Sequence, residues 1–421
     1  MRLTDSWEAL REKNFRWLFI ARTISLSGAS MAPVAFAFAV LDVGGTAKAL
    51  GLVLAGRTTA LVVFLLVSGI VSDRFPRRLV LIASHAVTAL TQGLVAWLVI
   101  SGNATVASVF VLECLNGAVS AFTMPALQGV VAQVVPRRLL QQANALMSFA
   151  RNGTLVVGPA VAGVVVAGPG AGWALAVNAL AYAGAALALT RLVIPPIART
   201  ASSMVRDLRD GWAEFTRYQW LWVIVVAFGF LNAIHMGVWM VLGPFVAKQH
   251  PDTLGERGWG LVLAAEAAGA ILMTLVLMRG QLRHPLRAGM AGVSLIAVPL
   301  VLLGLAPTVV LLVPAAFVAG AGIEVFGTGW NVSLMENVPP QAMSRVVSYD
   351  MLGSYIAIPV GTTVFGALST VSDPRWLAGV AGVGYLVICL ATLALPSVWR
   401  LERVAAGGPV DRSAEQAAQG S

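Results

Sequence analysis

The chain has 421 residues, of which 58% are hydrophobic and only 11% are Asp, Glu, Lys or Arg. Soluble domains carry about 25% charged residues, so this composition excludes a soluble protein and indicates one that spans a membrane. The net charge of +9 does not indicate nucleic-acid binding, because the basic residues lie in alternate loops instead of one patch. Cys114 and Cys389 both lie in apolar runs, which fits neither a disulfide framework nor a metal site.

Twelve apolar segments follow one another along the chain, and each is long enough to cross a bilayer. The first begins near Phe15 and lacks the small-residue cleavage site of a secretory signal, so we expect it to be retained. The sequence therefore predicts an all-α polytopic membrane protein. The predicted spans are residues 15–41, 47–71, 78–101, 104–127, 141–168, 171–194, 219–247, 257–279, 287–306, 308–333, 347–371 and 374–397.

Basic residues predict the orientation. Of the 28 Lys and Arg residues, 22 fall in segments on the N-terminal side of the membrane, four fall in the opposite loops, and Arg22 and Arg57 lie within spans. Basic loops stay in the cytoplasm. We therefore expect a multi-pass protein of the cell membrane with both termini cytoplasmic.

The longest inner connection divides the chain between the sixth and seventh spans. Its residues 207–215 form an amphipathic stretch that we expect to lie at the membrane surface. The predicted parts are an N-terminal six-helix half (1–194), a cytoplasmic linker with this amphipathic helix (195–219), a C-terminal six-helix half (220–399) and a disordered cytoplasmic tail (400–421).

The two halves resemble each other. The segment Gly51–Ala55 reads Gly-Leu-Val-Leu-Ala, and Gly260–Ala264 repeats it in the eighth span. Further matches pair Val135-Pro136 with Val338-Pro339, Gly158 with Gly361 and Gly163 with Gly366. Six-span repeats are a transporter architecture in which substrate binds near the midplane, between the halves.

A charged hairpin joins the second and third spans: Gly69-Ile70-Val71-Ser72-Asp73-Arg74-Phe75-Pro76-Arg77-Arg78. It resembles the signature loop G-x-x-x-D-R-x-G-R-R of the major facilitator superfamily, with Pro76 where the family has glycine. The resemblance covers nearly the whole chain and implies the major facilitator fold, with two six-helix pseudo-repeats in the bacterial cytoplasmic membrane.

Three further stretches are similar to exporter branches of this superfamily. Gly158-Pro159-Ala160-Val161-Ala162-Gly163 resembles the G-P-x-x-G-G element of drug antiporters, with Ala162 replacing one glycine. Residues 15–25 and 345–354 resemble the bacterial subgroup that contains enterobactin exporters and macrolide efflux proteins.

The resemblance implies a conformational latch formed by Gly69, Asp73, Arg74, Arg77 and Arg78. A carboxylate such as Asp73 is stabilised at the N-terminal end of a helix. The family supplies the partner, the inner end of the eleventh helix, and this contact would hold the halves in the outward-facing state. Gly69 would allow the close approach. The alternative is that these charges serve only orientation.

Gly158, Pro159 and Gly163 form a predicted helix-interface motif. Small residues permit tight helix packing, and proline can bend a helix because it removes a backbone hydrogen bond. The motif is expected at the interface between the halves. Generic small-residue packing is the alternative.

Ionisable residues inside lipid are costly and usually functional. The predicted spans contain Arg22, Arg57, His85, Glu113, His235, Glu266 and Glu324. The resemblance places the first, fourth, seventh and tenth helices around a central cavity, so Glu113, His235 and Glu324 have the best claim to line it.

Burial disfavours a charged carboxylate, so Glu113 or Glu324 could carry a coupling proton. The alternative is a carboxylate that neighbouring donors hold without any titration. Many proton-coupled antiporters have an arginine where this chain has Glu113, which puts their coupling scheme in doubt here.

The remaining candidate residues within the spans have a weaker claim to a functional role. Arg57 and Glu266 occupy equivalent repeat positions with opposite charge, and could form an ion pair or bind substrate. Arg22 could bind an anionic group, and His85 is expected to pack as a buried polar residue. Trp239 could line the cavity, although packing is commoner for tryptophan.

These features predict a secondary active exporter of a small amphipathic compound, a drug or secondary metabolite, driven by proton antiport through alternating access. No ATP-binding G-x-x-x-x-G-K-[ST] run occurs, and no cofactor, metal or catalytic group is predicted. The expected partners are a small-molecule substrate, protons and the lipid bilayer, and the protein is expected to be a monomer. Alternatives are a siderophore exporter, a proton-coupled importer and a transport-inactive sensor. A membrane-embedded enzyme is a further alternative, but no nucleophile–base pair or metal-ligand set in the sequence supports it.

Overall fold

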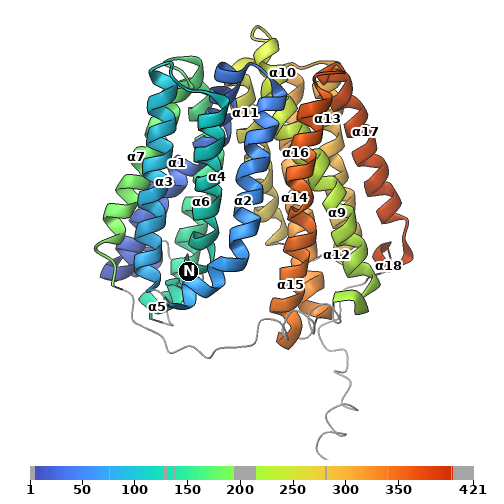
Figure 1. Cartoon of the computed structure of the whole chain (residues 1–421). Helices are drawn as coiled ribbons and strands as arrows, with labels where there is room; N and C mark the ends of the chain where they lie inside the picture. Colours follow the sequence, from blue (N-terminus) through green and yellow to red (C-terminus); the bar gives the residue numbers. More distant parts are fainter. Residues whose placement is uncertain are drawn as a thin grey trace, which may run out of the picture.

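The computed structural model describes residues 5–74, 76–127, 130–136, 139–193, 215–279, 282–338, 340–399 and 401 (Figure 1). Within these ranges the regular structure is entirely helical. A lipid-embedded backbone must satisfy its own hydrogen bonds, and helices do so without a partner segment.

The N-terminal bundle contains a 3-10 helix and seven α-helices, which are η1 (Asp5–Arg11), α1 (Lys13–Gly44), α2 (Ala47–Arg74), α3 (Arg77–Ile100), α4 (Val106–Leu127), α5 (Val130–Val134), α6 (Leu140–Ala167) and α7 (Ala171–Leu189). The C-terminal bundle contains α9 (Gln219–Gly237), η3 (Val238–Leu242), α10 (Gly243–Gln249), α11 (Gly255–Leu277), α12 (Pro285–Val293), η4 (Ser294–Ile296), α13 (Ala297–Leu305), α14 (Val309–Asn337), α15 (Pro340–Tyr355), α16 (Ala357–Leu368), α17 (Pro374–Leu393) and α18 (Pro396–Trp399).

In the described part of the chain, twelve helices are long and apolar enough to cross a membrane. Each overlaps one predicted span, from Lys13–Gly44 to Pro374–Leu393, so the predicted all-α fold with twelve spans is confirmed. Residues 194–214 and 402–421, which hold most of the predicted linker and tail, lie outside the described residues.

Three spans are not continuous α-helices, which the sequence did not predict. The seventh contains the π-helix η3 between α9 and α10. The ninth tightens to a 3-10 turn at η4, shortly before Pro299, which cannot donate a backbone hydrogen bond. The eleventh is interrupted between α15 and α16. π-helical turns in α-helices are frequent at functional sites.

The two bundles stand side by side (Figure 1), and each packs mainly within itself. We call the end at which α1 begins the inner end, and the opposite end the outer end. The bundles touch mainly where α2 meets α16 and where α6 meets α11.

These two contacts are related by the internal repeat. A Cβ built on Gly260 of α11 would fall 3.0 Å from the Gly163 Cα of α6, and one on Gly366 of α16 would fall 3.4 Å from the Gly51 Cα of α2. Both glycine pairs lie near the outer ends of their helices. Matching sequences in the two halves therefore form matching contacts that close the outer end.

An ion pair adds to this closure. Lys248 Nζ at the end of α10 lies 2.5 Å from Asp42 Oδ1 near the end of α1, so it joins the two bundles. Both side chains are partly exposed, at 35% and 50%, so solvent weakens the pair.

Candidate functional site

A buried polar network crosses four helices of the N-terminal bundle. Glu113 of α4 is fully buried and lies 3.3 Å from Arg57 Nη1 of α2. Gln92 Nε2 of α3 donates to Glu113 Oε1 at 2.5 Å, and Asn178 Nδ2 of α7 donates to Gln92 Oε1 at 3.4 Å. These contacts are the arrangement expected of a carboxylate that its neighbours hold in place.

Arg57 and Glu113 form an ion pair whose geometry does not meet the criteria for a hydrogen bond. Glu113 Oε2 has no hydrogen-bond partner within the described structure, although it is the oxygen that faces Arg57. The side chain of Arg57 is 36% exposed. Glu113 is therefore fully enclosed by protein, while its cationic partner is not.

A second cluster lies in the C-terminal bundle. Trp239 Nε1 donates to Glu266 Oε2 of α11 at 2.7 Å, and His235 Nε2 lies 4.0 Å from Glu266 Oε1. Trp239 belongs to the π-helix η3 and His235 to the last turn of α9. The Glu266 and His235 side chains are 18% and 12% exposed, so neither is fully covered by protein.

Arg57 and Glu266 do not pair with each other, which corrects one of the two roles considered for them. Each finds its partner in its own bundle, Glu113 for Arg57 and the His235–Trp239 pair for Glu266. Their repeat equivalence is nevertheless visible, because Gly117 of α4 packs on the Arg57 backbone as Gly320 of α14 packs on the Glu266 backbone.

Glu324 lies in α14 with an intermediate exposure. Its carboxylate accepts a hydrogen bond from Thr328 Oγ1, one turn further along the same helix, at 3.4 Å. In the part of the chain that the structure describes, no cation pairs with it. Glu324 is therefore a half-exposed carboxylate within a span.

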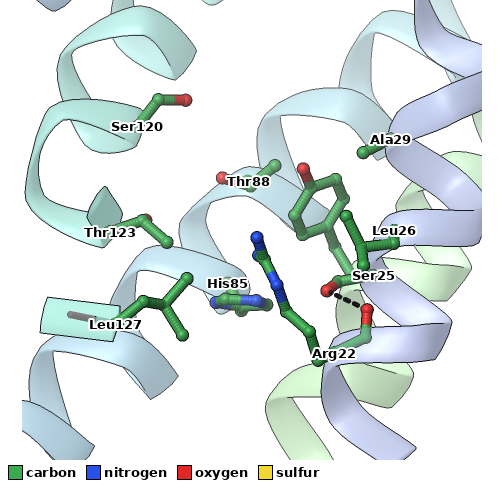
Figure 2. Close-up of a pocket in the computed structure, with 10 residues that line it drawn as sticks. Arg22, Ser25, Leu26, Ala29, His85, Thr88, Ser120, Thr123 and Leu127 are labelled. Atoms are coloured by element: carbon green, nitrogen blue, oxygen red, sulfur yellow. Dashed lines mark hydrogen bonds between the residues drawn. The ribbon is translucent and has the colours of Figure 1, made fainter. Parts of the chain in front are cut away.

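Two adjoining cavities lie toward the inner end of the N-terminal bundle. The larger, of about 380 Å³, lies among α1, α3, α4 and α7 (Figure 2). It is lined by Arg22, Ser25, Leu26, Ala29, His85, Thr88, Ser120, Thr123, Leu127 and Tyr182. In Figure 2 the Arg22 side chain extends past His85 toward Thr88. The second cavity, of about 220 Å³, shares Arg22 and adds Arg151 and Asn144 of α6.

His85 packs as expected. It is 4% exposed, its Nδ1 contacts the Leu81 carbonyl oxygen at 2.9 Å, and its ring lies 5.5 Å from the Tyr182 ring. Trp239 is also buried, at 2% exposed, and packs edge-on against Trp259 with ring centroids 4.9 Å apart. Packing and the hydrogen bond to Glu266 therefore account for Trp239.

The interface motif spans two contacts of α6. A Cβ on Gly158 would collide with Ser30 of α1, and one on Gly163 would fall 2.9 Å from the Glu256 carbonyl oxygen of α11. Pro159 lies inside α6, and its carbonyl oxygen faces Gly260. The motif therefore packs α6 both within its own bundle and across to the other.

The predicted latch lies largely outside the described residues. Helix α2 reaches Arg74, but the side chains of residues 65–75, which include Gly69, Asp73 and Arg74, are not described. Arg77 and Arg78 begin α3 and are half-buried. Arg78 Nη2 donates to the Thr190 carbonyl oxygen at the end of α7, which ties the start of α3 to α7.

Sequence reasoning missed several of these residues. Gln92, Asn178 and Tyr182 are polar but uncharged at neutral pH, whereas the residues singled out within the spans are glutamates, arginines and histidines. Arg151 was counted with the inner basic residues, but it lies inside the span Gln142–Ala167. Polar residues within apolar runs would have been the signal for all four.

Among the described residues, no group of three or more His, Cys, Asp or Glu side chains could hold a metal ion. Two bundles that meet at the outer end, with ionisable groups inside their spans, are an arrangement typical of alternating-access transporters.

Comparison with known proteins identifies the family. The profile described as "Transmembrane secretion effector" matches residues 4–289, more than half of the chain. The chain belongs to this family of major facilitator superfamily transporters. The predicted resemblance to the superfamily's drug and siderophore exporter subgroup is confirmed by the relatives that follow.

The transporter is similar along nearly its whole length to named exporters. It is 26% identical over 409 residues to the multidrug efflux pump Tap of Mycobacterium tuberculosis, covering 94% of this chain and 96% of the pump. It is 24% identical over 392 residues to the enterobactin exporter EntS of Citrobacter koseri, covering 90% and 91%.

A solved structure gives the same fold. The nucleoside transporter NupG superposes with a TM-score of 0.73 at 17% identity, covering 90% of this chain and 98% of that protein. The protein is therefore a multi-pass bacterial membrane transporter of small molecules.

Proposed function

We propose that this transporter is a secondary active exporter of a small amphipathic compound, working by alternating access and driven by proton inflow. The similarity to a multidrug efflux pump and an enterobactin exporter supports export. The observation that carries proton coupling is the Glu266 cluster, because a carboxylate and an imidazole inside a membrane are a functional site by default.

The proposed proton carrier is Glu266, with His235 beside it. A separation of 4.0 Å lets the carboxylate and the imidazole share a proton after a small movement. Trp239 holds Glu266 in place from η3, and the bundle contact between η3 and α2 connects this site to the interface that must open. A change in the charge of Glu266 would therefore act on the contacts between the bundles.

Glu324 is the second candidate, because it lacks a cationic partner in the described structure and is only partly covered by protein. Glu113 is the weaker candidate of the two predicted from the sequence. It is fully enclosed by protein and held by Arg57 and Gln92, so a structural role explains it without titration.

We infer the conformational state of the transporter from its closed outer end and its cavities near the inner end. With both termini in the cytoplasm, this closure leaves the cavities at Arg22 on the cytoplasmic side, where a substrate for export would enter. We retain the latch proposal for the opposite state.

The test uses everted membrane vesicles whose lumen is acidified by respiration. Addition of a transported compound should release protons from the lumen, and a pH-sensitive dye would report this release. We would add ethidium, phenylnaphthylamine and anilinonaphthalene sulfonate in turn. Proton antiport is rejected if vesicles with the protein behave like vesicles without it for every compound.

Matched variants separate the carboxylates. Glu266→Gln should abolish compound-evoked proton release, and Asp252→Asn, in an exposed outer loop, should leave it unchanged. If Glu266→Gln keeps full release while Glu324→Gln loses it, the proton site belongs to Glu324. Full release in both variants contradicts a proton carrier in the C-terminal bundle.

A further inference from the structure

Arg22 is an arginine within a membrane span whose side chain has no counter-ion. In the described part of the chain, neither Arg22 nor Arg151 forms a salt bridge, whereas Arg57 pairs with Glu113. An uncompensated charge inside a membrane is costly, so it is kept where it pairs with a ligand or faces a water-filled cavity. We propose that Arg22 and Arg151 form the binding site for an anionic group of the exported compound.

The two arginines converge on one place from different helices. Arg22 of α1 lines both the cavity of about 380 Å³ and the one of about 220 Å³, and Arg151 of α6 lines the second. Two cations held together without an anion between them repel, and a bound anion relieves that repulsion.

Among the described residues that line the two cavities there is no carboxylate. Glu113 is a fully buried carboxylate of this bundle that Arg57 and Gln92 already engage, so it is not free to neutralise Arg22. The balance of charge in the cavities remains positive.

The rest of the lining suits an amphipathic anion. Guanidinium groups match carboxylate, sulfonate and phosphate oxygens with paired hydrogen bonds. The hydroxyl groups of Thr88 and Tyr182 also line the larger cavity, while Leu26 and Leu127 offer apolar surface. A cavity of about 380 Å³ lies within the range of small-molecule sites. The compound class is thus an acid that carries an apolar body.

This assignment rests on the proposed transport function, which it narrows to a substrate class. The second relative transports enterobactin by its name, whereas the first is named only as a multidrug pump.

A binding experiment tests it without any transport step. The full-length protein in lipid nanodiscs would be titrated with anilinonaphthalene sulfonate and with phenylnaphthylamine, which differ by the sulfonate, and empty nanodiscs would be subtracted. Loss of one charge-assisted contact weakens binding by about ten- to a hundredfold. Arg22→Gln should weaken sulfonate binding by about that factor and change phenylnaphthylamine binding by less than about twofold.

Three further variants keep the result interpretable. Arg22→Lys keeps the charge and should retain most sulfonate binding. Arg151→Gln should repeat the selective loss if Arg22→Gln does not fold. Arg283→Gln removes an exposed inner arginine of the other bundle and should change neither titration.

The proposal is overturned if Arg22→Gln and Arg151→Gln leave sulfonate binding unchanged, or weaken both probes equally in folded protein. This outcome is separate from the vesicle experiment. Charge-selective binding without proton release would contradict the coupling proposal alone, and proton release evoked by ethidium but never by the sulfonate would contradict the anion site alone.

Discussion

The glycine contacts at the outer end give the sharpest prediction. Gly260→Ala places a Cβ 2.5 Å from the Pro159 carbonyl oxygen and 3.0 Å from the Gly163 Cα. Both neighbours are backbone atoms, so α6 and α11 must separate to accommodate it. Overpacking of this kind costs about 1–3 kcal/mol, and because the contact exists only when the outer end is closed, closure bears the full cost.

A penalty of that size changes a two-state equilibrium by about five- to 150-fold. Alanine also favours a helix over glycine by about 0.8–1.0 kcal/mol, but this gain is equal in both conformations and cancels. Gly384→Ala in α17 is the matched control, because a Cβ there meets no atom within 4 Å. The control should keep the original equilibrium.

Pulsed electron paramagnetic resonance would measure the closure. Spin labels at Asn103 and Asp252, exposed in the outer loops of the two bundles, report the distance across the outer end. The unmodified protein should give the short distance and Gly260→Ala a larger share of a longer one. An unchanged distance distribution in Gly260→Ala would refute the idea that this contact holds the outer end closed.

Four other results are expected. Glu113→Ala should lower the unfolding temperature in detergent, because it removes about 1–3 kcal/mol of stability; the loss is less than for a fully buried pair since Arg57 is 36% exposed. The double variant Arg57→Met, Glu113→Leu should recover much of that stability, and no recovery would contradict a purely structural pair. Asp42→Lys should weaken the outer closure by less than about 1 kcal/mol and so slightly increase the share of the longer spin-label distance. Adding Lys248→Asp to the same chain should restore the original distribution, and an effect that survives high salt would argue against the ion pair. In proteoliposomes, an interior-negative potential should speed outward movement of anilinonaphthalene sulfonate, because each negative charge that leaves releases about 2.3 kcal/mol of free energy per 100 mV. A transport rate that does not change with the potential would contradict outward movement of an anion. Asp73→Asn should leave expression and insertion intact while transport falls, and full transport would reject the latch.

The number of spans and the internal repeat could be predicted from the sequence because both depend on local properties. A bilayer demands about twenty apolar residues per crossing and permits them only as helices in this chain, so hydropathy alone sufficed. The repeat also indicated useful contacts. Gly51 and Gly260, matched in the sequence, occupy matching places in the outer closure, as do their partners Gly366 and Gly163.

The partners of the charged residues could not be predicted. A soluble helix shows its buried face by a polar opposite face, but a membrane helix is apolar toward lipid and apolar toward its neighbours. The sequence therefore gives almost no indication of how α2 and α11 are rotated about their axes. Only tertiary packing turned Arg57 toward Glu113 and Glu266 toward Trp239.

The same reason explains the candidate site. The sequence by itself determined a twelve-span transporter architecture with a charged inner hairpin and a handful of ionisable groups within lipid. The tertiary structure decided which of those groups are neutralised by the protein and which are not. Arg22 and Arg151 are far apart in the chain and meet at one cavity without an anion, because pairing within lipid depends on distances between helices that no local pattern encodes.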